Sequence, residues 1–118
     1  AGADLELYSG NDDQVLPILS LGGLGVISVL SNVAPKETHD MVMKFLDGDI
    51  QGAAKIQIDA IPLINALFCE VNPIPVKTAL NLMGMNVGPL RMPLCDMEDN
   101  TKAALAKEIE KFGLKLAE

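Results

Sequence analysis

Residues able to do covalent or acid–base chemistry occur in this chain, but their spacing assembles no catalytic group. His39 is the only histidine, so a cluster of histidine ligands for a metal ion is excluded. Cys69 and Cys95 lack the CxxC spacing of a zinc site. The eight lysines, whose amines could form a Schiff base only in a desolvated pocket, all lie on predicted helices or at helix ends. From the residues alone we expect no catalytic residue, no metal site and no cofactor.

Two glycine-containing segments lie between predicted elements in opposite order, one between a helix and a strand and the other between a strand and a helix. Gly22-Gly23-Leu24-Gly25 follows a predicted helix and precedes a predicted strand, which favours the end of a helix over a phosphate-binding loop. Gly10-Asn11-Asp12-Asp13 follows a strand and opens a helix, where α/β proteins bind their ligands. Acidic residues at this place also serve as plain helix caps. Both interpretations of the second segment stay open.

The elements that must position these residues begin with a strand, a helix and a second strand. Leu5 and Leu7 alternate with polar or amphipathic neighbours, which predicts a strand over Leu5–Ser9. A helix follows from about Asp12 to Leu21, and the β-branched run Val26–Leu30 predicts a buried strand. This is a βαβ unit, so we expect its strands to be parallel and its crossover to be right-handed.

The rest of the sequence predicts helices. Pro35 suits a first helical position, Gly48 ends that helix, and Asp49 is placed to cap the next one. Pro62 is expected to kink this second helix, and an extended connector over Asn72–Pro75 follows it. The predicted helices are 35–47, 50–68, 76–83 and, from between 96 and 99, to 112. Candidate core residues include Val15, Leu19, Met41, Leu46, Ile50, Phe68, Leu105 and Ile109.

Composition excludes several classes of protein. The chain has 118 residues, with 16 acidic against 9 basic side chains and a net charge of −7, which argues against a nucleic-acid partner. Hydrophobic residues make up 49%, which argues against disorder, yet no apolar run reaches about 18 residues, so no membrane span is expected. Ala1–Asp4 has no features of a signal peptide. Two cysteines are too few for a disulfide scaffold, so we expect free thiols and the cytoplasm.

The ordered motifs resemble one family. Residues 7–12 (LYSGND), 21–29 (LGGLGVISV), 72–77 (NPIPVK) and 90–94 (LRMPL) are similar, in this order and spacing, to the dihydrodipicolinate synthase family. These are pyruvate-dependent class I aldolases related to N-acetylneuraminate lyase. The resemblance covers essentially the whole chain, and the segment 72–77 favours the synthases over the lyases.

The resemblance implies an α/β fold that is incomplete. Members of the family are TIM (β/α)8 barrels with additional C-terminal helices, and a complete barrel takes about 250 residues. The chain therefore resembles a C-terminal fragment. Residues 1–48 match the last two βα units, with strands seven and eight, and residues 49–118 match the C-terminal helical extension.

The resemblance also implies a lyase activity for the complete protein. In the family, a lysine on strand six forms a Schiff base with pyruvate. The resulting enamine condenses with aspartate semialdehyde in the diaminopimelate pathway of lysine biosynthesis. The catalytic lysine, the proton-relay residues, the semialdehyde-binding arginine and the allosteric lysine site correspond to positions upstream of this chain. We expect the fragment alone to be inactive.

By matching positions, the resemblance assigns this chain one wall of the substrate pocket. Ile27 corresponds to a strand-eight residue whose backbone touches pyruvate, and Gly10 lines the same cavity through its backbone. Asn11 and Asp12 are candidates for contacts with the second substrate, although many relatives have Asp where Asn11 stands. Asn72 is a candidate for the pocket rim.

Partners follow from the same resemblance. The missing N-terminal part of the barrel is one, and further copies in a homo-oligomer, a dimer or tetramer, are others, with Pro17, Ser20 and Leu21 as candidate contacts. Two alternatives stay open. One is a pyruvate-dependent aldolase of the same family with a different acceptor. The other is a non-enzymatic helical interaction module, which would fold independently and give Ile27 no role.

Overall fold

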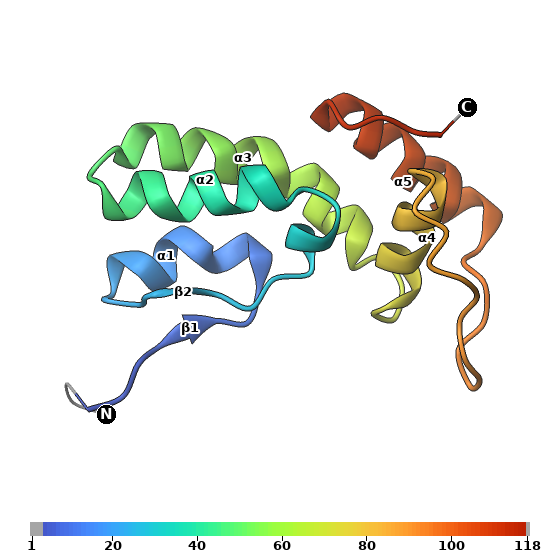
Figure 1. Ribbon diagram of the computed structural model, residues 1–118, viewed down its shortest axis with the longest axis horizontal. Coiled ribbons are helices and arrows are strands. Elements are labelled where there is room, and N and C mark those ends of the chain that lie inside the picture. Colours follow the sequence, from blue (N-terminus) through green and yellow to red (C-terminus); the bar gives the residue numbers. More distant parts are fainter. Residues whose placement is uncertain (1–3, 118) are drawn as a thin grey trace. The chain divides into compact units, whose positions relative to one another are not determined.

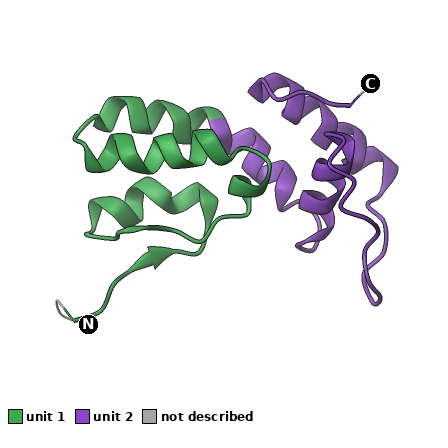
Figure 2. Cartoon of the chain, in the orientation of Figure 1, with its two compact units in different colours: residues 1–59 green, residues 60–118 purple. Residues whose placement is uncertain are grey.

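The computed structural model describes residues 4–117, and the chain separates into two compact units, residues 1–59 and 60–118 (Figure 2). The border lies inside helix α3 (Ile50–Leu67). The expectation of no signal peptide rests on Ala1–Asp4, of which residues 1–3 lie outside the described part. From the sequence we expect a boundary between the last two βα units of a barrel, residues 1–48, and a C-terminal helical extension, residues 49–118. That boundary stays a prediction.

Unit 1 contains two short parallel strands. β1 (Tyr8–Ser9) pairs with β2 (Gly25–Val26) in the register Tyr8 to Gly25 and Ser9 to Val26. A 3-10 turn, η1 (Asp12–Gln14), and helix α1 (Val15–Ser20) connect them. The parallel pairing predicted for a βαβ unit is confirmed.

Helix α1 forms the middle layer of unit 1. It contacts both strands on one side and helix α2 (Pro35–Leu46) on the other, and Figure 1 shows this order. Val15 and Leu19, one helical turn apart, pack with Met41 of α2 in a fully buried cluster. Ile56 of α3 packs against the same cluster. The predicted core residues of α1 and α2 are therefore confirmed at these three positions.

The predicted strand over Val26–Leu30 is wrong beyond Val26. The backbone leaves the sheet there and enters a 3-10 turn, η2 (Leu30–Asn32). The physical reason is the Asp12 carboxylate, whose Oδ2 accepts hydrogen bonds from the N–H groups of Val29 and Leu30, both at 2.9 Å. Those donors are then not available to a neighbouring strand. The first strand is also shorter than predicted, because Leu5–Leu7 lies outside the paired segment.

The helix boundaries agree closely with the sequence. α2 begins at Pro35, and Gly48, with a φ of 91°, follows its end. α3 begins at Ile50 and ends within one residue of the prediction. Three predicted core residues are exposed instead, because they lie in the last turn of α2, in the first turn of α3 and just after α3: Leu46, Ile50 and Phe68.

Unit 2 contains the rest of α3 together with α4 (Ile74–Leu82) and α5 (Asp99–Phe112), which contact each other. Leu105 and Ile109 of α5 are fully buried, as predicted. The extended connector is shorter than expected, because Ile74 and Pro75 already belong to α4. Among residues 4–117, no helix combines the length and the apolar character needed to cross a bilayer.

The long segment between α4 and α5 is tied to α4 by side chains. Asn81 accepts a hydrogen bond from the Val87 N–H at 2.9 Å and donates one to the Gly88 carbonyl at 3.1 Å. Lys77 Nζ donates to the Pro89 carbonyl at 2.8 Å. Cys69 and Cys95 are exposed, free thiols, which agrees with the sequence prediction.

Candidate functional site

The carboxyl ends of β1 and β2 meet at one edge of the strand pair. Because the strands are parallel and Ser9 pairs with Val26, the next residues, Gly10 and Ile27, occupy neighbouring positions. The Ile27 N–H donates to the Ser9 carbonyl at 2.8 Å, which fixes this neighbourhood. The structure thus brings together two of the residues that the sequence singles out, at the edge where α/β proteins bind ligands.

Among the described residues, the Ile27 carbonyl is a free acceptor at this edge. A continued parallel ladder would use the Asn11 N–H as its donor. That N–H donates instead to Ser9 Oγ at 3.2 Å, and the Ser9 hydroxyl donates to the Asn11 carbonyl at 2.8 Å. Within residues 4–117 no donor reaches the Ile27 carbonyl, and the Ile27 side chain is 74% exposed. A ligand at this edge would therefore meet an unpaired backbone carbonyl.

Asp12 is buried, with 2% of its surface exposed, and its carboxylate is used inside the chain. Oδ1 accepts a hydrogen bond from the Ser28 hydroxyl, while Oδ2 accepts from the N–H groups of Val29 and Leu30 at 2.9 Å each. The carboxylate therefore points to the turn after β2. This geometry favours a structural role for Asp12 over contact with a second substrate.

Gln57 of α3 is a polar contact that the sequence reasoning missed. Its side chain is 7% exposed, donates from Nε2 to the Asp12 carbonyl at 2.8 Å, and accepts at Oε1 from the Leu16 N–H at 3.3 Å. The partners lie more than forty residues earlier in the chain. The only signal was an amide side chain between two isoleucines, Ile56 and Ile58.

The remaining predicted site residues are exposed. Asn11 lies at the same strand edge as Gly10. Asn72 belongs to unit 2, where it precedes α4, and its role at a pocket rim stays a prediction. On α1 and directly after it, the three candidate subunit contacts are all exposed, Leu21 to 79%: Pro17, Ser20 and Leu21.

Unit 1 has a largely apolar cavity of about 310 Å³ between the strand pair and α2. Tyr8 and Gly25 line it from the strands, and His39 and Val42 line it from α2. Its walls suit an apolar side chain better than a charged metabolite. His39 is the only titratable imidazole of the chain, and no other histidine is present to share a proton or a metal with it.

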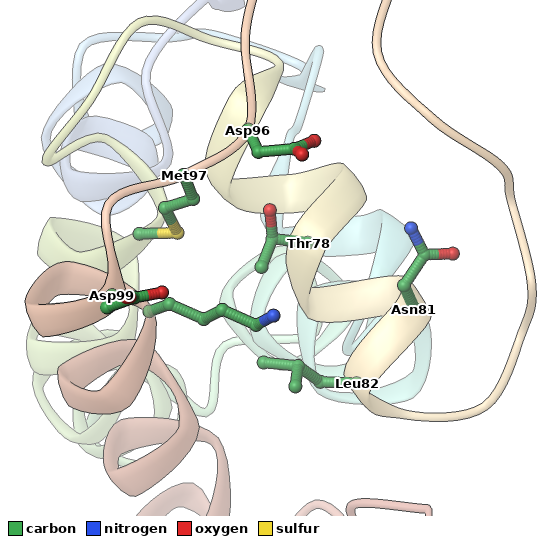
Figure 3. A pocket seen from close by; sticks show the side chains of 7 residues that line it. Thr78, Asn81, Leu82, Asp96, Met97 and Asp99 are labelled. Carbon is green, nitrogen blue, oxygen red and sulfur yellow. The ribbon is translucent and has the colours of Figure 1, made fainter.

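Unit 2 has a polar cavity of about 420 Å³ between α4 and α5. Figure 3 shows Thr78 and Leu82 of α4 opposite Asp99 of α5, with Asp96 and Met97 in the segment that leads into α5. The carboxylates are exposed, so water competes with any ligand for them. Among residues 4–117, no group of three or more histidine, cysteine or acidic side chains is arranged to hold a metal ion.

Comparison with known proteins gives one consistent family. The model of the dihydrodipicolinate synthetase family matches residues 1–112. A 4-hydroxy-tetrahydrodipicolinate synthase of Lachnoclostridium phytofermentans is 62% identical over 110 residues, which cover 93% of this chain and 37% of that protein. The chain thus spans well under half the length of the relatives that it matches.

Similar solved structures belong to the same family. The dihydrodipicolinate synthase of Thermotoga maritima is 41% identical, with a TM-score of 0.93 over 97% of this chain and 39% of that one. The enzyme of Aquifex aeolicus is 38% identical, with a TM-score of 0.94 over 99% of this chain and 40% of that one. The backbone of residues 4–117 is therefore similar to part of these larger structures.

Proposed function

Because this chain belongs to the dihydrodipicolinate synthetase family, we propose that it is the C-terminal part of a 4-hydroxy-tetrahydrodipicolinate synthase. In such an enzyme a lysine outside this chain forms a Schiff base with pyruvate, and the enamine condenses with aspartate semialdehyde for lysine biosynthesis. The observation that carries the proposal is the 62% identity over 93% of the chain, although only 37% of the relative is covered. A short unrelated module would not match in this way.

In the proposed enzyme β1 and β2 are strands seven and eight of a (β/α)8 barrel, and their carboxyl edge is one wall of the pocket. The unpaired Ile27 carbonyl lies at that edge. A carbonyl oxygen carries partial negative charge, which suits the positive charge on an imine between lysine and pyruvate. Gly10, with no side chain, leaves the neighbouring backbone open to the substrate. This chain contributes shape and polarity, and the reacting lysine comes from elsewhere.

The exposed apolar side chains of unit 1 support an incomplete barrel. Leu5, Leu7, Tyr8, Leu24 and Ile27, along or beside the two strands, are between 45% and 74% exposed. A two-stranded pair has two open edges, which soluble proteins normally cover. We propose that the remaining strands of the barrel cover them. A self-contained helical module would have no reason to keep these side chains in water.

We also propose that the complete enzyme is a cytoplasmic homo-oligomer and that α1 contributes to its subunit contacts. Leu21 is the most exposed large apolar residue of this region, at 79%. Pro17, one turn earlier, and Ser20, the residue directly before Leu21, are also exposed, and the Ser20 hydroxyl donates to the Pro17 carbonyl at 2.7 Å. An apolar side chain held on an ordered helix end suits a subunit interface.

The test is borohydride trapping with pyruvate followed by mass spectrometry. The chain alone should give no adduct, since its eight lysines do not include the imine-forming one. The chain mixed with the remaining part of the protein should form the adduct on the other part and condense pyruvate with aspartate semialdehyde. An adduct on this chain alone would contradict the proposal. Condensation with an N-acetylhexosamine instead of the semialdehyde would identify the alternative aldolase.

A further inference from the structure

We propose that Asp12 is a positioning residue, which holds the turn after β2 and thereby sets the direction of the Ile27 carbonyl. The inference rests on the proposed function, because the Ile27 carbonyl matters to catalysis only if pyruvate binds at this edge. It differs from the expectation of a contact with the second substrate, since the Asp12 carboxylate faces its own chain.

The first step is the convergence of three donors on one buried carboxylate. The Ser28 hydroxyl, the Val29 N–H and the Leu30 N–H come from consecutive residues and all donate to Asp12. Successive backbone N–H groups that point to one place form a binding site for an anion. Hydrogen bonds to a charged acceptor are roughly twice as strong as neutral ones. The turn is therefore built around a charge that Asp12 supplies.

The second step connects this turn to Ile27. The Ile27 carbonyl belongs to the peptide unit between Ile27 and Ser28, and both sides of that unit are held. On one side the Ile27 N–H donates to the Ser9 carbonyl at 2.8 Å. On the other side the Ser28 hydroxyl is bound by Asp12 and also accepts from the Ser31 N–H at 2.9 Å. Rotating the carbonyl away from the strand edge would strain one of these anchors.

The third step is that Asp12 is itself held in place. Gln57 donates to the Asp12 carbonyl at 2.8 Å and accepts from the Leu16 N–H at 3.3 Å, so α3 clamps the start of α1. Both Asp12 and Gln57 are buried, so these bonds are protected from water. The chain of contacts runs from α3 through Asp12 to the peptide that carries the Ile27 carbonyl.

A carboxylate suits this place because three groups donate to it at once. In an Asp12→Asn variant one oxygen becomes an NH2 group, which cannot accept from the Ser28 hydroxyl, and the remaining oxygen is an uncharged and therefore weaker acceptor for the Val29 and Leu30 N–H groups. The turn then keeps its place less firmly. We expect kcat/KM for pyruvate to fall roughly tenfold or more, which is the range that follows from losing a charged hydrogen bond. The KM for aspartate semialdehyde should change by less than about twofold, because Asp12 does not face that substrate.

The experiment uses the complete enzyme that contains this chain. Asp12→Asn and Ser28→Ala remove two sides of the same contact, and Ser28→Thr, which keeps the hydroxyl, should restore kcat/KM for pyruvate. Gln14→Glu is the matched control, because it exchanges an amide and a carboxylate in the same 3-10 turn at an exposed position. It should behave like the wild type.

Hydrogen exchange at the Val29 and Leu30 amides gives a second measurement that does not depend on activity. Both amides should exchange faster in Asp12→Asn, because an uncharged amide oxygen holds them less firmly than a carboxylate, and unchanged exchange would overturn the inference. A variant in which only the KM for the semialdehyde rises would also overturn the inference. Variants that unfold at a lower temperature but keep wild-type kinetics would overturn it as well. Failure of the proposed function is separate, since the wild-type enzyme would then form no borohydride-trapped pyruvate adduct.

Discussion

At the scale of single residues, Asp49 shows how one carboxylate begins a helix. Its Oδ1 accepts from the Gly52 N–H at 2.9 Å, and its Oδ2 lies 3.0 Å from Lys44 Nζ. The Gly52 hydrogen bond, and next to it the Lys44 ammonium, lower the pKa of the Asp49 carboxyl below its ordinary 3.8. The sequence predicted this cap, because an acidic residue directly before a helix is a local signal.

The pH dependence of Asp49 follows from the direction of that change. A pKa that is lower in the folded state means that the carboxylate stabilises the fold above the unfolded pKa, and that this contribution is lost as the pH falls through the folded value. We predict that Lys44→Met raises the pKa of Asp49 only part of the way to 3.8, because the Gly52 contact stays. An NMR titration of the Asp49 carboxyl carbon checks this. An ordinary pKa in the wild type would contradict it.

Lys36 and Asp40 give a simpler case on α2. The two side chains form an ion pair one helical turn apart, and the hydrogen bond from Lys36 lowers the pKa of the Asp40 carboxyl. We predict that Lys36→Met raises the pKa of Asp40 most of the way to 3.8, because Lys36 is the main cause of the lowering, no backbone hydrogen bond contributes, and only the smaller effects of the His39 and Lys44 charges stay. The same titration measures both aspartates. The expected result is a larger return toward 3.8 at Asp40 than at Asp49, where the Gly52 hydrogen bond stays.

At the scale of elements, helices could be predicted from the sequence much better than strands. Pro35, Gly48 and Asp49 fix helix ends through contacts within a few residues. Val26–Leu30 has the composition of a strand, yet its state depends on Asp12, which precedes it by more than a dozen residues. Gln57 was missed for the same reason, since its partners lie still farther away in sequence. Gly10 and Ile27 could be predicted, because they lie at strand ends and within motifs that resemble a known family. Structure that depends on neighbouring residues could be predicted from the sequence, whereas polar contacts between distant residues could not.

The packing of α1 on α2 can be tested with two methionines of one helix. Met41 is fully buried beside Val15 and Leu19, whereas Met43 is 40% exposed. We predict that Met41→Ala destabilises the fold by about 2–5 kcal/mol through lost contacts and a cavity. Met43→Ala should cost about 0.5 kcal/mol or less. Denaturant unfolding of the complete protein, monitored by circular dichroism, separates the two. Equal effects would mean that the buried cluster is not the core of unit 1.

At the scale of the whole molecule, the chain carries more exposed apolar surface than a self-sufficient small domain needs. The exposed apolar residues beside the strand pair include Leu5 at 66% and Ile27 at 74%. For a domain of this size, exposing a few hundred Å² of apolar strand surface to water costs a free energy comparable to the total free energy of unfolding. This exposed surface agrees with the proposal that the rest of the protein covers it, since the chain spans 37–39% of its relatives.

We predict that the purified chain self-associates. Sedimentation velocity should give species larger than a 12.5 kDa monomer, and the dye ANS, which binds exposed apolar surface, should fluoresce strongly.

Replacing Leu5 and Leu7 by lysine should reduce the association, because charges on an open strand oppose edge pairing. Leu21→Lys, directly after α1, is the control that separates association through the strands from association through the helix. Adding the remaining part of the protein should dissolve the assemblies, since the missing strands compete for the same surface. A compact monomer without ANS binding would show that helices of this chain shelter the strand pair, and the incomplete-barrel interpretation would then be wrong.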